Sequence, residues 1–122
     1  MNAAYLIIAH GSKDEQANRE FFRFMEHFRK AYPKRKAEGA FLEIAKPSIP
    51  DTIDALAGGG TKEIVVIPLM LFSGRHVKEH IPEILEKAKG RHPDLDFHYA
   101  TPLGEHPGML TIVEEKARAL KP

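Results

Sequence analysis

The chain alternates between short, continuous apolar runs and longer stretches in which apolar residues recur at helical spacing. A run without alternation is typical of a parallel strand that is buried on both faces. We therefore predict four strands, over Ala3–Ala9, Ala37–Ile44, Glu63–Leu71 and Asp96–Ala100. In the third strand, Pro68 has no N–H to donate, so we expect strand pairing to loosen there.

The residues between and after the strands predict helices. The first helix covers Lys13–Tyr32, and Pro33 stops it. The second begins at Ser48, the expected N-cap with Asp51 in the capping-box position, and it ends at the glycines 58–60. The last helix carries four apolar residues at helical spacing, namely Leu110, Val113, Ala117 and Leu120.

The start of the third helix is predicted from Pro82, which suits a first helical turn. Its ring would clash with the carbonyl of Lys78 if the helix already ran through that turn. The segment Phe72–His76 is therefore predicted to be a loop, and His80 is predicted to lie at or near the N-cap. His76 and His80 nevertheless stand four residues apart, which is the spacing of a helical metal pair.

The resulting order of elements is βαβαβαβα within 122 residues. Such alternation implies an α/β fold, in which right-handed crossovers place helices on both faces of a parallel sheet. We predict a three-layer αβα arrangement around a four-stranded parallel sheet, with residues 1–122 forming a single unit.

Composition and charge narrow the classes of function. Eighteen basic and seventeen acidic residues leave a net charge of +1, which argues against a nucleic-acid binder. The chain has no cysteine, which excludes disulfides, thiolate metal sites and iron–sulfur clusters. No apolar stretch approaches the roughly 18 residues of a membrane span, and the N-terminus lacks the basic region of a signal peptide. We therefore expect a cytoplasmic protein that makes no membrane contact.

Side chains able to carry chemistry stand where the predicted strands end. His10 follows the first strand, Glu43 lies at the end of the second, and His76 follows the third. Because open parallel sheets bind ligands outside the carboxyl ends of their strands, we expect these side chains to share one edge. Two imidazoles and a carboxylate suit a borderline divalent ion such as cobalt, nickel, iron or zinc. Imidazole can also accept a proton near neutral pH.

Each of these residues also has a structural interpretation. His10 could simply cap or turn its loop, and His76 could be an ordinary residue of a glycine-containing loop. A carboxylate such as Glu43, close to a buried strand end, needs a partner or a position at the rim. We expect at least two of Met70, Leu71 and Phe72 to belong to the core, the alternative being an apolar wall for a flat ligand.

Four basic residues lie in or beside the same loops, namely Lys13, Lys46, Arg75 and Lys78. They are either ordinary solvated charges or a ring of cations for a polyanionic substrate.

Three motifs at this edge resemble those of the CbiX/SirB chelatases, and the chain length resembles that of the short CbiX form. The first is His10-Gly11-Ser12 after an apolar strand. The second is Phe41-Leu42-Glu43 followed by Pro47-Ser48-Ile49, and the third runs from Pro68 to Pro82 with Gly74 and His76. Where the family usually has an acidic residue before the Ile-Pro of the third helix, this chain has His80.

The resemblance implies a sirohydrochlorin chelatase of cobalamin or related tetrapyrrole biosynthesis. Such an enzyme inserts a divalent metal ion, cobalt in the first place and nickel or iron in relatives, without hydrolysing a nucleotide. The lack of a GxxxxGK[ST] motif agrees with this. The resemblance further implies a homodimer of half-domains, because longer relatives resemble two such units fused in one chain.

The same resemblance assigns roles to individual residues. His10 and His76 become the metal-site and catalytic histidines, and Glu43 becomes their acidic partner. Residues expected to contact the tetrapyrrole are Ser12, Lys13, Lys46, Arg75 and Lys78.

Two rival hypotheses make different predictions. A metal carrier or tetrapyrrole-binding module with the same histidines would bind metal stoichiometrically without turnover. A flavodoxin-like regulatory or phosphate-binding domain would have a phosphate-contacting loop after the first strand, of which His10-Gly11-Ser12 is a poor version.

Overall fold

Four parallel strands form one sheet in the order β2-β1-β3-β4. The computed structural model describes residues 3–120, and its strands are β1 (Ala3–Ala9), β2 (Lys36–Phe41), β3 (Glu63–Pro68) and β4 (Asp96–Tyr99). The first strand has the predicted bounds, and the predicted parallel α/β fold is confirmed.

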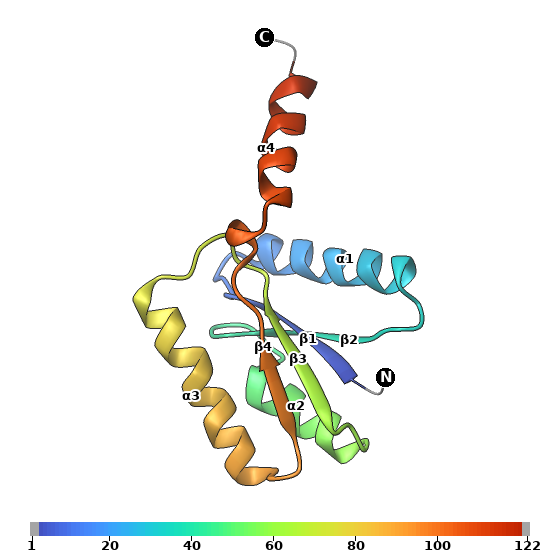
Figure 1. Ribbon diagram of the computed structural model, residues 1–122, viewed down its shortest axis with the longest axis vertical. Coiled ribbons are helices and arrows are strands. Elements are labelled where there is room, and N and C mark those ends of the chain that lie inside the picture. The colour runs from blue at the N-terminus through green and yellow to red at the C-terminus, as the bar shows by residue number, and fades with distance from the viewer. Residues whose placement is uncertain (1–2, 121–122) are drawn as a thin grey trace.

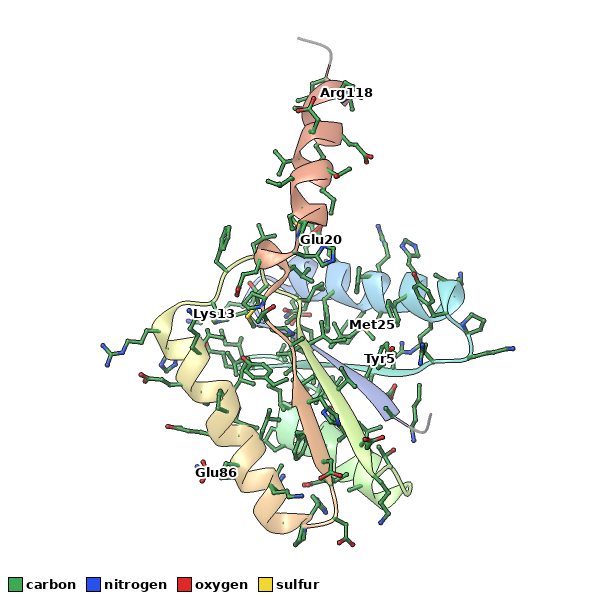
Figure 2. All side chains as sticks on the ribbon, in the orientation of Figure 1. Tyr5, Lys13, Glu20, Met25, Glu86 and Arg118 are labelled. Carbon is green, nitrogen blue, oxygen red and sulfur yellow. The ribbon has the colours of Figure 1, made fainter. Side chains whose placement is uncertain are left out.

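Helices cover both faces of the sheet, as Figure 1 shows. On one face lies α1 (Glu15–Ala31), whose buried Phe21 and Met25 pack with Ile7 and Phe41 of the strands. On the other face lie α2 (Ile49–Gly58) and α3 (Arg75–Arg91), which share a larger apolar cluster with the sheet. Figure 2 shows Met25 and Tyr5 between α1 and the sheet. Burial of each such large apolar side chain contributes about 1.5–3 kcal/mol to stability.

Local capping explains where the first two helices begin. The side chain of Asp14 accepts a hydrogen bond from the N–H of Gln16 at 3.0 Å and caps α1. The hydroxyl of Ser48 accepts one from the N–H of Asp51 at 3.2 Å, which confirms Ser48 as the N-cap of α2. Strand β3 ends at Pro68, three residues before the predicted end. Proline has no N–H to donate, although Leu69 N–H still donates to the carbonyl of Ile8 in β1.

The predicted start of the third helix is wrong. Helix α3 begins at Arg75, with Gly74 as N-cap, so His76 and His80 both lie within it and Pro82 is inside the helix. Proline costs one backbone hydrogen bond and crowds the preceding turn. Four residues of α3 are buried against the core and offset this cost: Val77, Ile81, Leu85 and Ala88.

The last helix lies outside the three layers. A short 3₁₀ turn, η1 (Leu103–Glu105), leads into α4 (Gly108–Ala119), which has the predicted helical period but no buried residue. Figure 1 shows α4 standing away from the rest of the molecule. Within residues 3–120, no helix combines the length and the apolar character that crossing a bilayer requires.

An ion-pair cluster joins α2 to the end of α3. The carboxylate of Asp54 accepts hydrogen bonds from Nη2 of Arg91 at 3.0 Å and contacts Nε2 of His92 at 2.7 Å. The hydrogen bond with His92, followed by the contacts with Arg91, lowers the pKa of Asp54 below its ordinary value of 3.8. A carboxylate with a lowered pKa stabilises the fold above that ordinary value, and the contribution is lost as the pH falls below it.

We therefore predict that Asp54→Asn destabilises the protein more at pH 7 than at pH 3. The expected loss is below about 1 kcal/mol, because solvent screens a carboxylate whose side chain is 46% exposed. Urea unfolding of both proteins at the two pH values measures this difference. Glu86→Gln, an exposed substitution on α3 (Figure 2), serves as the control. An equal loss for Asp54→Asn at both pH values would contradict the prediction.

Candidate functional site at the carboxyl edge of the sheet

The side chains of His10 and Glu43 meet at the carboxyl edge of the sheet. Nε2 of His10 lies 2.8 Å from Oε2 of Glu43, and both side chains are about half exposed. Backbone pairing of the two segments continues beyond β2, since Leu42 N–H donates to the carbonyl of Ala9 and Glu43 N–H donates to the carbonyl of His10. This extended ladder sets the imidazole and the carboxylate side by side.

The backbone around this pair is tightly constrained. Gly11 has a φ of +97°, and a Cβ at this position would overlap the carbonyl oxygen of Glu43. Ile44 has a φ of 72°, and Ala45 N–H donates to the carbonyl of Glu43 at 2.8 Å, which closes a γ-turn. A positive φ at a β-branched residue is strained, and such strain concentrates at functional sites.

A cavity of about 500 Å³ opens between the start of α1 and the segment that follows Glu43. Ser12, Lys13 and Lys46 all line it, so three of the five predicted substrate contacts share one cavity. Lys13 is labelled in Figure 2, in the loop that joins β1 to α1. Sequence reasoning missed Asn18, which also lines the cavity and whose Oδ1 accepts a hydrogen bond from Ser12 N–H. No spacing signal in the sequence points to this contact.

His76 and His80 form a second pair on the first turns of α3. Their ring centroids are 5.4 Å apart, and Nδ1 of His80 is buried without a hydrogen-bond partner. Because β3 pairs with β1, the helix that follows β3 starts at the edge where His10 lies. The i,i+4 spacing was the signal for this pair, and placing His80 at the N-cap obscured it.

The structure does not join the two pairs into one metal cluster. Within residues 3–120, no three or more histidine, aspartate or glutamate side chains come close enough together to hold a metal ion. His10 contacts Glu43, whereas the ring of His76 lies beside that of His80 at an interplanar angle of 45°. Of the sequence-predicted trio, His10 and Glu43 therefore form one pair, and His76 pairs with His80 instead.

The remaining basic residues lie further along the same edge. Arg75 is exposed and pairs with Glu79 at 3.2 Å, and Lys78 is exposed in the same turn of α3. Neither belongs to the lining of the cavity that contains Lys13 and Lys46.

Three large apolar side chains are exposed at this edge. Ile44 is 59% exposed, Leu71 is 53% exposed and Phe72 is 78% exposed. The expectation that at least two of Met70, Leu71 and Phe72 belong to the core is wrong, since only Met70 packs against it. Strand β3 ends at Pro68, so Leu71 and Phe72 belong to the loop that follows it. Their side chains therefore do not alternate between the two faces of the sheet.

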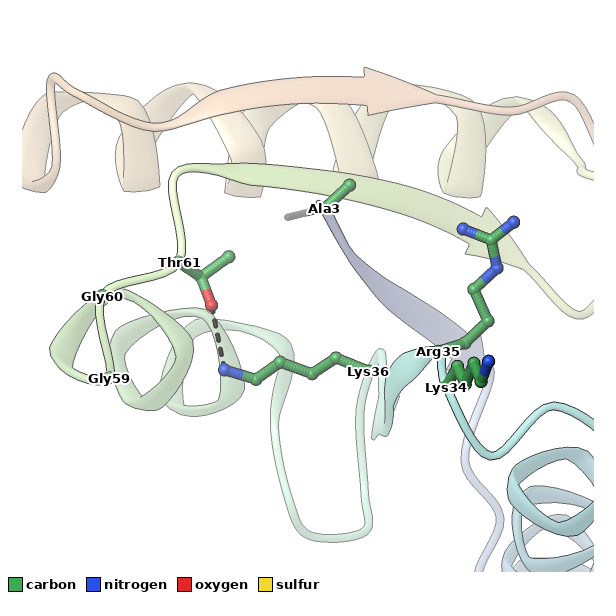
Figure 3. Close-up of a pocket in the computed structure, with 7 residues that line it drawn as sticks. All are labelled: Ala3, Lys34, Arg35, Lys36, Gly59, Gly60 and Thr61. Carbon is green, nitrogen blue, oxygen red and sulfur yellow. Dashed lines mark hydrogen bonds between the residues drawn. The ribbon is translucent and has the colours of Figure 1, made fainter. Parts of the chain in front are cut away.

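Another cavity, of about 340 Å³, lies at the opposite edge of the sheet (Figure 3). Its lining includes Ala3, Lys36 and Thr61, which stand where β1, β2 and β3 begin. Nζ of Lys36 donates a hydrogen bond to the hydroxyl of Thr61 across it. We assign the candidate site to the carboxyl edge, because parallel sheets bind ligands there. The His10–Glu43 pair and the His76–His80 pair both lie at this edge.

Comparison with known proteins identifies the family. The family model of CbiX matches residues 4–120. The chain is 37% identical over 112 residues to the sirohydrochlorin cobaltochelatase of Priestia megaterium, and 30% identical over 113 residues to the sirohydrochlorin ferrochelatase of the same organism. These alignments cover 91% and 93% of this chain but only 36% and 42% of the two relatives, so the chain spans about two fifths of their length.

A solved structure gives the same result. SirB from Bacillus subtilis with Fe3+ superimposes with a TM-score of 0.89 at 28% identity, over 100% of this chain and 48% of that one. The match therefore extends to the fold and to nearly every residue of the chain. On these grounds the chain belongs to the CbiX family.

Proposed function

We propose that this chain inserts a divalent metal ion into sirohydrochlorin without nucleotide hydrolysis, in cobalamin or related tetrapyrrole biosynthesis. In the overall reaction, the macrocycle loses the protons of two pyrrole N–H groups and the metal takes their place between the nitrogens. The site must therefore accept protons and deliver a metal ion to the ring.

The observation that carries the proposal is the contact between His10 and Glu43. A carboxylate that accepts a hydrogen bond from Nε2–H fixes the imidazole tautomer and leaves Nδ1 with its lone pair. Nδ1 of His10 can then take a pyrrole proton or bind the incoming ion. In the first case Glu43 stabilises the imidazolium that results.

His76 supplies the second imidazole at the same edge, and we propose that His80 assists it. The unpartnered Nδ1 of His80 and the ring contact with His76 favour a shared role in holding the metal before transfer. Two or three protein ligands leave positions open on the ion, as a transfer site requires.

Binding of the macrocycle fits the chemistry of the surrounding surface. The exposed Ile44, Leu71 and Phe72 offer apolar area to a flat ring. Lys13 and Lys46 line the cavity beside His10 and supply positive charge for the ring carboxylates. Arg75 and Lys78 extend this charge along α3 in our proposal.

Cobalt is the metal that we propose. The relative named a cobaltochelatase is 37% identical to this chain, compared with 30% for the one named a ferrochelatase. Affinity rises along the divalent series for almost any nitrogen–oxygen site, so discrimination rests on geometry and supply. Nickel and iron are therefore the alternatives to compare with cobalt.

We also propose that residues 1–122 act as a half-domain in a homodimer. SirB is about twice as long, since this chain matches 48% of it over its whole length. One small edge can hardly enclose a large planar ring, and a twofold dimer supplies a second edge.

An anaerobic spectrophotometric assay with sirohydrochlorin and Co²⁺, Ni²⁺ or Fe²⁺ tests the proposed activity. Multiple turnovers with at least one metal are expected, with the highest rate for cobalt. Stoichiometric metal binding without turnover for any metal would favour the carrier hypothesis instead.

The histidines have a specific expected effect in this assay. His10→Ala and His76→Ala should each lower the rate by about 10²- to 10⁴-fold, because each removes a proton acceptor or metal ligand. Glu43→Gln should cost about 10- to 100-fold, since it leaves a hydrogen-bonding group but removes the charge that supports His10. His27→Ala, which removes an exposed histidine of α1, is the control and should keep the wild-type rate.

Gly11→Ala tests whether the backbone positions Glu43. The added Cβ would displace the carbonyl of Glu43 and strain a residue with a φ of +97°. We expect a loss of about 1–3 kcal/mol in the free energy of unfolding and a lower insertion rate in the fraction that remains folded. Gly90→Ala is the matched control, because a Cβ at Gly90 meets nothing within 4 Å. Unchanged stability and rate in Gly11→Ala would contradict this role.

Lys46→Gln tests the basic rim. Removing one cation from the cavity should raise KM for sirohydrochlorin about three- to tenfold and leave kcat nearly unchanged, because the charge binds substrate and transition state alike. The effect should shrink at high salt. Lys30→Gln, an exposed change in the last turn of α1, is the control. A fall in kcat with constant KM would assign Lys46 a different role.

A further inference from the structure

The side chain of Asn18 holds the backbone of the loop that carries His10. Asn18 lies near the start of α1, and its Oδ1 accepts a hydrogen bond from Ser12 N–H at 3.1 Å. Its Nδ2 donates a second hydrogen bond to the carbonyl of Ser12 at 2.8 Å. One side chain thus satisfies both backbone polar groups of a residue that lies two positions after His10.

A carboxamide is the side-chain group that suits this paired contact. It presents an acceptor oxygen and a donor nitrogen on one planar group, whereas a carboxylate has only acceptors. Asparagine is also a weak helix former, so helix propensity does not account for its place in α1. Asn18 is half-buried, and partial exclusion of water strengthens the two hydrogen bonds.

The hydroxyl of Ser12 attaches the same loop to the helix. It accepts a hydrogen bond from Asp14 N–H at 3.0 Å, and Asp14 in turn caps α1. Ser12 is therefore connected to the start of α1 through its N–H, its carbonyl and its hydroxyl. With three such contacts, Ser12 has little freedom to move independently of the helix.

The segment after β2 holds the other side of the loop. Glu43 N–H donates to the carbonyl of His10 at 3.1 Å, and the carbonyl of Glu43 occupies the space that a Cβ of Gly11 would need. Gly11, with a φ of +97°, stands between the two anchored residues His10 and Ser12. Because glycine can adopt many backbone conformations, the anchors on both sides are needed to keep this one.

The direction of the His10 imidazole depends on this backbone. The side chain is half exposed, and Nε2 lies 2.8 Å from Oε2 of Glu43. A shift of the ring by about 1 Å would lengthen this contact beyond hydrogen-bonding range. Loosening of the loop at Ser12 is therefore enough to separate the imidazole from the carboxylate.

We propose that Asn18 is a positioning residue for His10. It contacts no reacting group and acts on the imidazole through Ser12 and Gly11. The inference rests on the proposed function, in which His10 accepts a proton or binds the metal ion. It adds the residue that keeps the His10 imidazole against Glu43.

A direct contact between Asn18 and the substrate makes a different prediction. Asn18 lines the same cavity as Lys46, so a contact with the macrocycle would appear mainly in KM, as it should for Lys46. A positioning role appears in kcat, because a displaced imidazole weakens the chemical step after the substrate has bound.

Insertion kinetics of Asn18→Ala test the positioning role. We expect kcat to fall about 10- to 100-fold, the usual effect of removing a group that orients a functional side chain, while KM changes less than about twofold. Gln16→Ala, an exposed substitution in the same turn of α1, is the control and should keep the wild-type rate. A raised KM at constant kcat would overturn the proposal in favour of direct contact.

Combination with His10→Ala separates positioning from a general loss of structure. If Asn18 acts through His10, adding Asn18→Ala to the His10→Ala chain should lower the rate by less than about twofold more. An equal fold loss in both backgrounds would overturn the proposal. Circular dichroism should show all of these variants folded.

Amide hydrogen exchange tests the same role without turnover. In Asn18→Ala, the Ser12 amide should exchange at least about tenfold faster, because it loses its acceptor. The Glu43 amide should also exchange faster, although Asn18 does not touch it, because its acceptor is the carbonyl of His10. The amide of Leu6, in the middle of β1, serves as the internal reference and should not change, and Gln16→Ala should alter none of the three.

The exchange data separate this inference from the proposed activity. Faster exchange at both Ser12 and Glu43 supports the positioning role even if no metal yields turnover. Unchanged exchange at Glu43 in Asn18→Ala overturns it even if the wild-type protein inserts metal at full rate.

Discussion

The parallel pairing of β1 with both β2 and β3 is the constraint on which the rest of the structure depends. Ile7 lies between Gly39 on one side and Ile67 on the other, so the strands run in step and end at one edge. This register places the candidate site residues His10, Glu43 and His76 at that edge. His10 leaves the centre of the sheet, and the segments after β2 and β3 leave on either side of it.

Within that frame, the short segment after β2 decides the geometry of the site. Two backbone bonds carry the pairing past Phe41, and the γ-turn at Ile44 then reverses the chain. Gly11 allows the carbonyl of Glu43 to come close, which a side chain would prevent. The imidazole–carboxylate pair therefore depends on backbone conformation at two residues that carry no catalytic group themselves.

Two parts of the surface carry large apolar side chains that are more than half exposed. One is the carboxyl edge, where Ile44 and Phe72 face solvent. The other is α4, on which Leu110, Val113 and Leu120 are exposed.

The sequence by itself determined the order of elements, the parallel sheet and the residues at its carboxyl edge. Continuous apolar runs and helical periods are local signals. In any parallel sheet, the carboxyl ends of the strands lie at one edge. The bounds of β1 and the cap at Ser48 could be predicted for the same reason.

Only the tertiary structure decided which side chains meet. The start of α3 at Arg75 depends on burial of Val77 and Ile81 against the sheet, which outweighs the local cost of Pro82. The contact between the rings of His76 and His80 follows from this start. The outward course of α4 depends on hydrogen bonds from η1 to a loop more than thirty residues earlier. Helical periodicity shows that α4 has an apolar face but not what that face contacts, because packing partners are set by interactions between segments that are distant in the chain.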